Sequence, residues 1–300
     1  MWALPAIRAL SRRMGEPVDL MVAAPFASIC PLIEQQSYIR HCAALEDWQP
    51  QDPAPINPRV PPNVRVPWSR WPVMETEEGG WRGLYDCVLH LGYRDWPKRP
   101  LPFETLDCLN EQIGHQRWGF VSSEAIRNTP LADAELALDE PWITTSANPQ
   151  YRPPIPSTAI HTIAVGFTDE HFELKFGLRW LLVHSDWDLQ VIGDSPRWSQ
   201  EAGAGRCTWS DSVEDLQQAV VFLGCNSALH VLAVACGVPV VMMEPNPMRH
   251  HSIFYPLGQD GPHVTLVKGV DGLPTWDSRR VRDALERVLR IGETIRPLRV

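Results

Sequence analysis

The second half of the sequence predicts an α/β domain with a parallel sheet that is covered by helices on both faces. Short apolar runs alternate there with segments of helical spacing. The runs are almost continuously apolar, which is typical of parallel strands buried on both faces. The length of 300 residues fits two domains better than one. The sequence therefore predicts two domains, of which the second is doubly wound.

The elements of this half follow one another from residue 160. The predicted strands are short and apolar, and they lie at 160–168, 187–195, 219–225, 238–244 and 263–269. The predicted helices have apolar residues at helical spacing, and they lie at 170–185, 212–219, 227–237 and 278–293. Asp211 or Ser212 is expected to cap the second helix and Asn226 or Ser227 the third, which Gly237 ends.

The boundary between the domains is predicted from proline. Many of the 29 prolines gather at 50–72 and at 153–156. Proline lacks a backbone donor and fixes φ, so the first stretch is predicted to be a long extended loop, with Trp68 and Trp71 as candidate anchors. The second stretch is predicted to be the linker, which gives domains at 1–152 and 153–300.

Composition and charge exclude several classes of protein. The net charge of -9 argues against a surface built for nucleic-acid phosphates. The longest nearly apolar stretch, 230–243, is interrupted by Gly237 and Pro239 and is too short to span a bilayer. At the N-terminus the apolar residues precede the arginines, the reverse of a secretory signal. Seven scattered cysteines without a CxxC pair predict neither a disulfide framework nor zinc, and a reducing cytoplasm is the expected location.

Ligands of doubly wound sheets bind beyond the carboxyl ends of the strands, so two strand–helix junctions are candidate sites. In the first, a strand ends at Gly224, and Asn226 or Ser227 begins a helix. The free N–H groups of that helix and a serine hydroxyl suit an anion. His230 lies one turn further along the helix. The alternative is an ordinary helix cap beside a core histidine.

The second junction covers 244–251. Glu244 ends a buried strand, and a carboxylate there can accept hydrogen bonds from two ribose hydroxyls. Arg249 is a candidate for a bidentate phosphate contact. The adjacent histidines 250 and 251 point apart, so no metal site is predicted. The alternative is a solvated loop.

The two junctions in tandem resemble the donor-site core of GT-B glycosyltransferases and are most similar to glycosyltransferase family 9, the group with the ADP-heptose:lipopolysaccharide heptosyltransferases. His230 matches the histidine that this family has near its helix start. Gly237-Val238-Pro239-Val240 matches the strand that follows. This sequence has Cys225-Asn226-Ser227 in place of the family's Asp-Ser/Thr-Gly, and Glu244-Pro245-Asn246-Pro247 in place of its Gly-Pro-Thr turn.

The first half extends the resemblance. Residues 1–10 look like the helix with the family's Leu-Pro-x-x-Arg-x-Leu pattern, 19–22 like its next strand, and 85–91 like its Tyr-Asp-x-Val-Ile strand. The family begins with a strand and a glycine-rich turn that carries an aspartate base, and this sequence starts after them: either residue 1 is not the true start, or the element has been lost. The resemblance thus implies a GT-B fold of two doubly wound Rossmann-type domains facing a cleft, the N-terminal one lacking its first strand.

The resemblance also implies an activity. The chain would transfer a sugar from an ADP-, UDP- or GDP-linked donor to a hydroxyl of a glycan, a lipid-linked saccharide or a modified nucleic acid, with inversion and with neither a metal nor a prosthetic group. The residues expected to bind the donor lie at strand ends and helix starts of the second domain, and they are Gly166, Thr168, Thr208, Trp209, Asn226, Ser227, Ala228, His230, Glu244 and Arg249.

An inverting transfer needs a base that deprotonates the acceptor hydroxyl. With the family's aspartate absent, the candidates follow the predicted strand 85–91 and are His90, Arg94 and Asp95. Asp95 is expected to be the base and Arg94 an anion contact. The alternative is an ion pair of Asp95 with a neighbouring cation on a solvated loop.

Two other functions remain open. The first is a phage-type glycosyltransferase that modifies hydroxymethylated bases in DNA. The loop at 50–72 favours it, because Arg59, Arg65 and Arg70 together with two tryptophans suit contacts to bases and phosphates. A non-catalytic homologue that binds only a nucleotide or a glycan is the second. A dinucleotide-dependent oxidoreductase is not predicted, because no GxGxxG follows a predicted strand.

Overall fold

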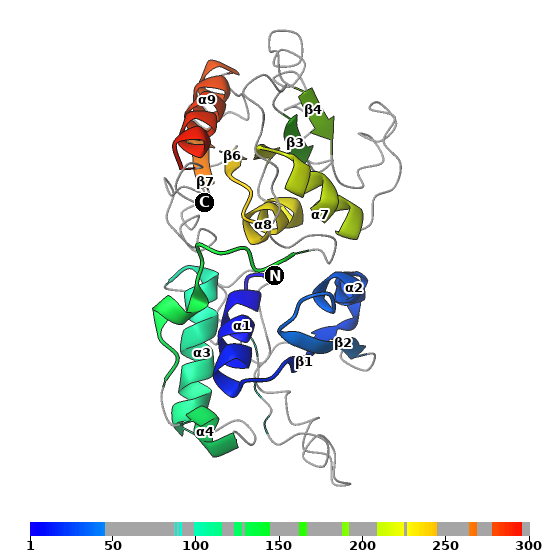
Figure 1. Cartoon of the computed structure of the whole chain (residues 1–300), viewed down its shortest axis with the longest axis vertical. Coiled ribbons are helices and arrows are strands. Elements are labelled where there is room, and N and C mark those ends of the chain that lie inside the picture. Colours follow the sequence, from blue (N-terminus) through cyan, green and yellow to red (C-terminus); the bar gives the residue numbers. More distant parts are fainter. Residues whose placement is uncertain are drawn as a thin grey trace, which may run out of the picture. The chain divides into compact units, whose positions relative to one another are not determined.

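The computed structural model of the chain describes helices and strands in both halves (Figure 1). The described residues are 1–45, 87, 89, 91, 99–115, 123–127, 130–144, 162–166, 188–191, 209–224, 227–244, 264–268 and 278–295. They divide into two compact units, an N-terminal one over Trp2–Leu138 and a C-terminal one that begins at Asp139. The predicted linker at 153–156 and the proline-rich loop at 50–72 lie outside the described residues.

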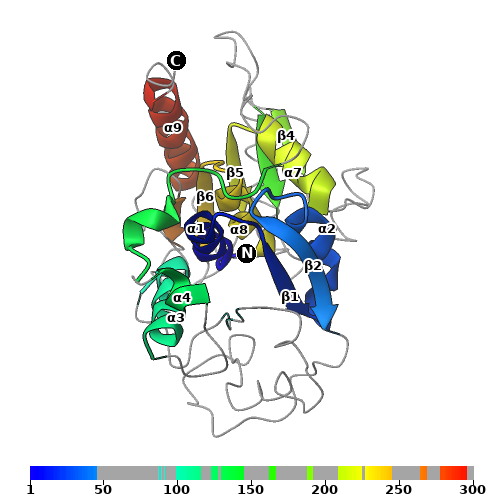
Figure 2. The same cartoon turned by 60° about the horizontal axis from the view of Figure 1, so that its bottom comes forward.

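A five-stranded parallel sheet forms the centre of the C-terminal unit, with the strand order β4-β3-β5-β6-β7 (Figures 1 and 2). Its strands are β3 (Thr162–Gly166), β4 (Asp188–Val191), β5 (Val221–Gly224), β6 (Val240–Glu244) and β7 (Val264–Lys268). All five predicted strands are therefore confirmed, and each neighbouring pair is parallel, as predicted. β5 is buried along its whole length, which explains its uninterrupted apolar sequence.

Within the described residues, three helices pack on this sheet: α7 (Trp209–Gln218), α8 (Ala228–Ala235) and α9 (Ser278–Ile295). α7 contacts β3 and α8, α8 contacts β5 and β6, and α9 contacts β5, β6 and β7. These helices confirm three predictions, and the helix predicted at 170–185 lies outside the described residues. The prediction that Asp211 or Ser212 caps the helix at 212–219 was wrong, because this helix, α7, already begins at Trp209. Asp211 and Ser212 lie inside its first turn.

Gly237 ends α8 as predicted, because it adopts a left-handed conformation with φ 72°. Its N–H donates to Val234 O at 2.9 Å, which closes the last turn. The chain at 139–144 lies close by: the N–H of Trp142 donates to Ala235 O at 2.9 Å. A Cβ added to Gly237 would lie 2.9 Å from Cγ of Pro141. This position therefore requires glycine for its backbone conformation and for the approach of Pro141.

Replacing Gly237 by alanine is expected to lower the free energy of unfolding by about 2 kcal/mol, through left-handed strain and the contact with Pro141. Gly15→Ala is the matched control, since Gly15 ends its helix with φ 77° but has no atom within 4 Å of the added Cβ. It should cost only about 1 kcal/mol, the strain alone. Equal losses in urea unfolding would mean that the contact with Pro141 contributes nothing.

The N-terminal unit contains two parallel strands, β1 (Val18–Ala23) and β2 (Ile39–Leu45). Its helical segments are α1 (Leu4–Met14), η1 (Ala24–Ile29), α2 (Cys30–Ile33), α3 (Leu101–His115), α4 (Ser123–Arg127) and η5 (Asp133–Leu136). α1 and β1 confirm the helix and the strand expected there, whereas β2, α2 and α3 were not predicted. The described part of this unit has helices and parallel strands, and a full Rossmann-type domain stays a prediction.

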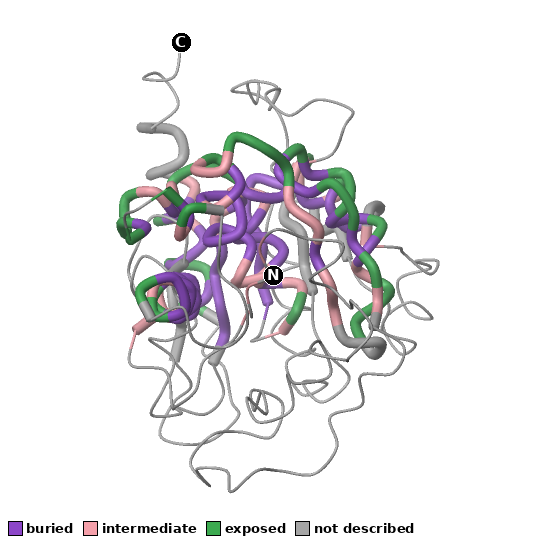
Figure 3. Tube along the Cα trace, turned by 90° about the horizontal axis from the view of Figure 1, so that it is seen from below, coloured by how far each residue is buried: buried purple, intermediate pink, exposed green. Residues whose placement is uncertain are grey.

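The core of the N-terminal unit gathers on α1 and α3; buried residues are purple in Figure 3. Leu4, Ile7, Leu106 and Leu109 are each at most 2% exposed. α1 is buried along most of its first two turns, including the charged Arg8. Helix α1 is therefore a central element of its unit rather than a surface helix.

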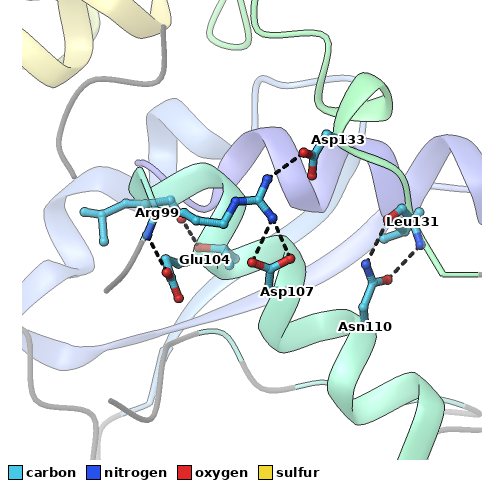
Figure 4. A network of polar contacts seen from close by, with 8 residues as sticks. Arg99, Glu104, Asp107, Asn110, Leu131 and Asp133 are labelled. Carbon is cyan, nitrogen blue, oxygen red and sulfur yellow. Dashed lines mark hydrogen bonds and ion pairs between the residues drawn. The ribbon is translucent and has the colours of Figure 1, made fainter. Parts of the chain in front are cut away.

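Polar side chains fasten the segment 131–138 to the helices of this unit (Figure 4). Asn110 on α3 donates to Leu131 O at 2.8 Å and accepts from Leu131 N–H at 2.7 Å. Nη1 of Arg99 donates to both carboxylate oxygens of Asp107 at 2.9 Å. Nη2 of the same arginine donates to Oδ2 of Asp133 at 2.5 Å. These ion pairs are exposed and each contributes little, so the paired backbone bonds of Asn110 define the position of the segment.

Candidate functional site

The candidate site lies at the carboxyl ends of β3 and β5, where the topology of the sheet reverses. β4, which follows β3 in the chain, lies on one side of β3 in the sheet. β5, which follows β4, lies on the other side of β3. Such a switch point is where doubly wound sheets bind ligands. The last residues of the two strands, Gly166 and Gly224, are partners in register. Because neither has a side chain, a ligand can approach the backbone of both strands.

α8 begins immediately beyond β5, with Ser227 as its N-cap residue, as predicted. The Ser227 backbone is extended, and its N–H donates to Nδ1 of His230 at 3.0 Å. The Ser227 hydroxyl does not cap the helix. Its Oγ is buried and makes no hydrogen bond to any residue that the structure describes. The first amides of the helix also lack intrahelical partners, so this end presents several donors to an anion.

His230 is fully buried and fixes the start of α8. Since Nδ1 accepts from Ser227 N–H, the neutral imidazole carries its proton on Nε2. Burial lowers the pKa of His230 to about 4. The ring is therefore neutral at physiological pH, and its visible role is the positioning of Ser227. This geometry fits the alternative of a core histidine, and a contact of His230 with a ligand stays a prediction.

Acidification is expected to destabilise the C-terminal unit through His230. The pKa is about 6.5 in an unfolded chain and about 4 in the folded protein, so the unfolded chain binds the proton first. The neutral, buried His230 therefore contributes fully to the free energy of unfolding above about pH 6.5. This contribution, roughly 3 kcal/mol, is lost progressively as the pH falls towards 4. His230→Gln, which cannot titrate, should show a weaker loss in urea unfolding between about pH 7.5 and pH 4.5. An equal pH dependence in both proteins would exclude His230 as its source.

Glu244 lies at the same edge of the sheet. Met242 of β6 pairs with Gly224, and Glu244 follows two residues later, opposite Lys268 of β7. The backbone of β6 thus carries Glu244 past the level at which β5 ends. A ribose contact of Glu244 stays a prediction.

Trp209 is the first residue of α7 and is half-buried. In a parallel sheet, the helix before a strand runs antiparallel to it and begins at the carboxyl edge. α7 precedes β5 and packs against β3 and α8. The start of α7 therefore brings Trp209 to the same edge of the sheet as Ser227. Ala228, which follows Ser227 in the chain, is exposed.

The remaining predicted site residues lie outside the described residues, and they are Thr168, Thr208, Asn226 and Arg249 for the donor and His90, Arg94 and Asp95 for catalysis. Cys87 and Leu89 precede His90, and both pack against Ile113 and Ile126. The strand predicted at 85–91 and the position of His90 on it stay predictions.

Gly224 was not among the predicted donor contacts, although the glycine that ends the strand was a visible signal. Only the register with Gly166 shows that the two strand ends coincide. In the described part of the chain, no three His, Cys, Asp or Glu side chains gather as metal ligands would. None of the helices described there is long and apolar enough to cross a membrane.

Comparison with known proteins gives matches among solved structures only. No family model matches the sequence, and no curated protein sequence is similar. E. coli heptosyltransferase WaaC with ADP-2-deoxy-2-fluoro heptose is 13% identical, with 95% of this chain and 96% of that chain covered and a TM-score of 0.47. E. coli ADP-heptose lps heptosyltransferase II is 12% identical, with 96% of each chain covered and a TM-score of 0.45. Both are heptosyltransferases, the group that the sequence resemblance named, and at this distance the function has to be inferred from the chain's own residues.

Proposed function

We propose that this chain is a glycosyltransferase that takes its sugar from a nucleotide-sugar bound at the carboxyl edge of the C-terminal sheet. One observation carries the proposal: two glycine strand ends, Gly166 and Gly224, meet in register at the topological switch point, next to the start of α8. There the buried Ser227 Oγ has no hydrogen-bond partner among the described residues. This combination suits a diphosphate, which needs close backbone approach and several donors.

The start of α8 would act on the leaving nucleotide. As the bond between sugar and phosphate breaks, negative charge grows on the diphosphate. Donors that already point to this place stabilise the charge without reorganisation. Amides at the helix start, the Ser227 hydroxyl and the positive end of the helix dipole would provide this stabilisation, which a divalent cation provides in other transferases. We therefore propose a metal-independent transfer.

The rest of the nucleotide would follow the same edge. Glu244 would accept hydrogen bonds from the ribose hydroxyls, and Trp209 would lie along the base. Asn226, Ala228 and His230 would complete the phosphate end of the site. Thr168, Thr208 and Arg249 are the further proposed donor contacts.

The acceptor would be a hydroxyl of a glycan or of a lipid-linked saccharide. Asp95 would remove its proton while the hydroxyl attacks the anomeric carbon from the side opposite the nucleotide, which inverts the configuration. His90 and Arg94 would lie beside it. A modified nucleic acid as acceptor is disfavoured by the net charge of -9.

Thermal unfolding with a panel of nucleotides and nucleotide-sugars tests the donor site. The panel contains ADP, UDP, GDP and CMP with their sugar forms, including ADP-heptose. One nucleotide is expected to stabilise the protein selectively, by about 2.7 kcal/mol at 100 times its Kd. Ser227→Ala should weaken its binding about tenfold, because a hydrogen bond to a charged group is lost.

Ser278→Ala is the matched control, since Ser278 begins α9 rather than the helix at the switch point. It should leave nucleotide binding unchanged. No stabilisation by any member of the panel would refute the donor site. Equal binding by Ser227→Ala and the unsubstituted protein would remove the serine from it.

A further inference from the structure

Two of the scattered cysteines meet in the N-terminal unit. Cys30 is the first residue of α2, and Cys42 lies in β2, against which α2 packs. Both are buried, with 8% and 6% of their surfaces exposed. Glu34 links their backbones: its N–H donates to Cys30 O at 2.9 Å, and its Oε1 accepts from Cys42 N–H at 3.0 Å.

The two thiols are also in direct contact. Burial, together with a hydrogen bond to the Cys30 side chain, raises the pKa of Cys42 to about 12. At neutral pH the Cys42 thiol therefore carries its proton.

We propose that Cys30 and Cys42 form a reversible intrachain disulfide, which fastens α2 to β2 when the protein meets a low-molecular-weight disulfide such as oxidised glutathione. The proposal is independent of the glycosyltransferase function. It requires only the packing of α2 on β2 and the contact of the two side chains.

The exchange takes place in two steps. Cys30 gives up its proton and attacks one sulfur of oxidised glutathione, which releases one reduced glutathione and leaves a mixed disulfide. Cys42 then loses its proton and attacks the Cys30 sulfur, which releases the second glutathione. Two electrons and two protons pass from the cysteines to the oxidant, and one S–S bond is formed for the one that is broken.

Peptide mapping of the oxidised full chain tests the pairing. Trypsin cleaves after Arg40, between the two cysteines, so a disulfide would join the peptides 14–40 and 41–59. After treatment of the native protein with oxidised glutathione and blocking of the remaining thiols, these two are expected as one linked species. Its mass should be about 2 Da below their sum, and dithiothreitol should separate them.

Single variants test the order of attack. Cys42→Ser should retain glutathione on Cys30, whereas Cys30→Ser should leave Cys42 without an adduct. Cys108→Ser is the control, since Cys108 is buried in α3 beside Gln112, and its loss should leave the linked peptides unchanged. Absence of the linked peptides from the folded, oxidised protein, or linkage of Cys30 to another cysteine, would overturn the proposal.

Discussion

Replacing Arg8 by methionine is expected to lower the free energy of unfolding by about 3 kcal/mol, because one buried and one half-buried carbonyl lose their donor. Nη2 of Arg8 donates to Leu136 O at 2.9 Å and to Ala137 O at 2.7 Å. The arginine is 5% exposed and lies on α1. Methionine retains the apolar volume of the side chain but has no donor, so the loss measures the hydrogen bonds rather than a cavity. Urea unfolding is the measurement.

Arg12→Met is the control for Arg8, since Arg12 lies on the same helix and is exposed. Its effect should stay within about 0.5 kcal/mol, as for most surface positions. Similar losses for both variants would mean that the arginine positions of α1 are equivalent, and the bonds to 136 and 137 would then not stabilise the unit.

Replacing Asp95 by asparagine is expected to reduce sugar transfer by about 10² to 10⁴-fold, the usual contribution of a general base. Asparagine has nearly the same shape but cannot accept a proton, so the affinity for the nucleotide should not change. Transfer is measured with the nucleotide-sugar identified by thermal unfolding, and nucleotide affinity is measured in parallel.

Asp107→Asn serves as the control for Asp95, because Asp107 is an exposed aspartate paired with Arg99 and has no proposed part in the reaction. It should transfer sugar at the normal rate. Unchanged transfer by Asp95→Asn would contradict the assignment of the base, and a loss of nucleotide affinity in the same variant would indicate a structural role.

The C-terminal sheet could be predicted from the sequence because its strands are short apolar runs between helices. Phe222 and Val240 are fully buried, so their strands have no polar face and stand out from the surroundings. Gly237 could be predicted to end α8 for a similar reason, since few other residues adopt its left-handed conformation.

The N-terminal unit was less predictable because its signals are mixed. In β2, Arg40 and His41 are polar neighbours rather than part of an alternating pattern, and Arg40 pairs with Asp19 of β1. Within α3, the polar Thr105 and Gln112 are buried and bond to carbonyls one turn earlier, so the apolar face of the helix is interrupted. In a sequence, buried polar residues whose hydrogen bonds are made inside the protein look the same as polar residues on the surface.

For the candidate site, residue types were predictable but their arrangement was not. The sequence indicated Ser227 at a helix start, and the structure adds that its hydroxyl does not cap the helix. It indicated His230 near a ligand, whereas its Nδ1 is occupied by the Ser227 amide. Strand order and register, which bring Gly166 to Gly224, depend on long-range pairing that no local pattern encodes.

The most direct test of the proposed donor site is hydrogen–deuterium exchange of the full chain with and without a saturating nucleotide-sugar. We expect slower exchange at the start of α8, in the backbone amides of 227–231, and at the ends of β3 and β5. Amides that bind a diphosphate and lose access to water exchange more slowly. Protection confined to other parts of the chain, or no protection with any nucleotide-sugar, would contradict the placement of the donor at this edge of the sheet.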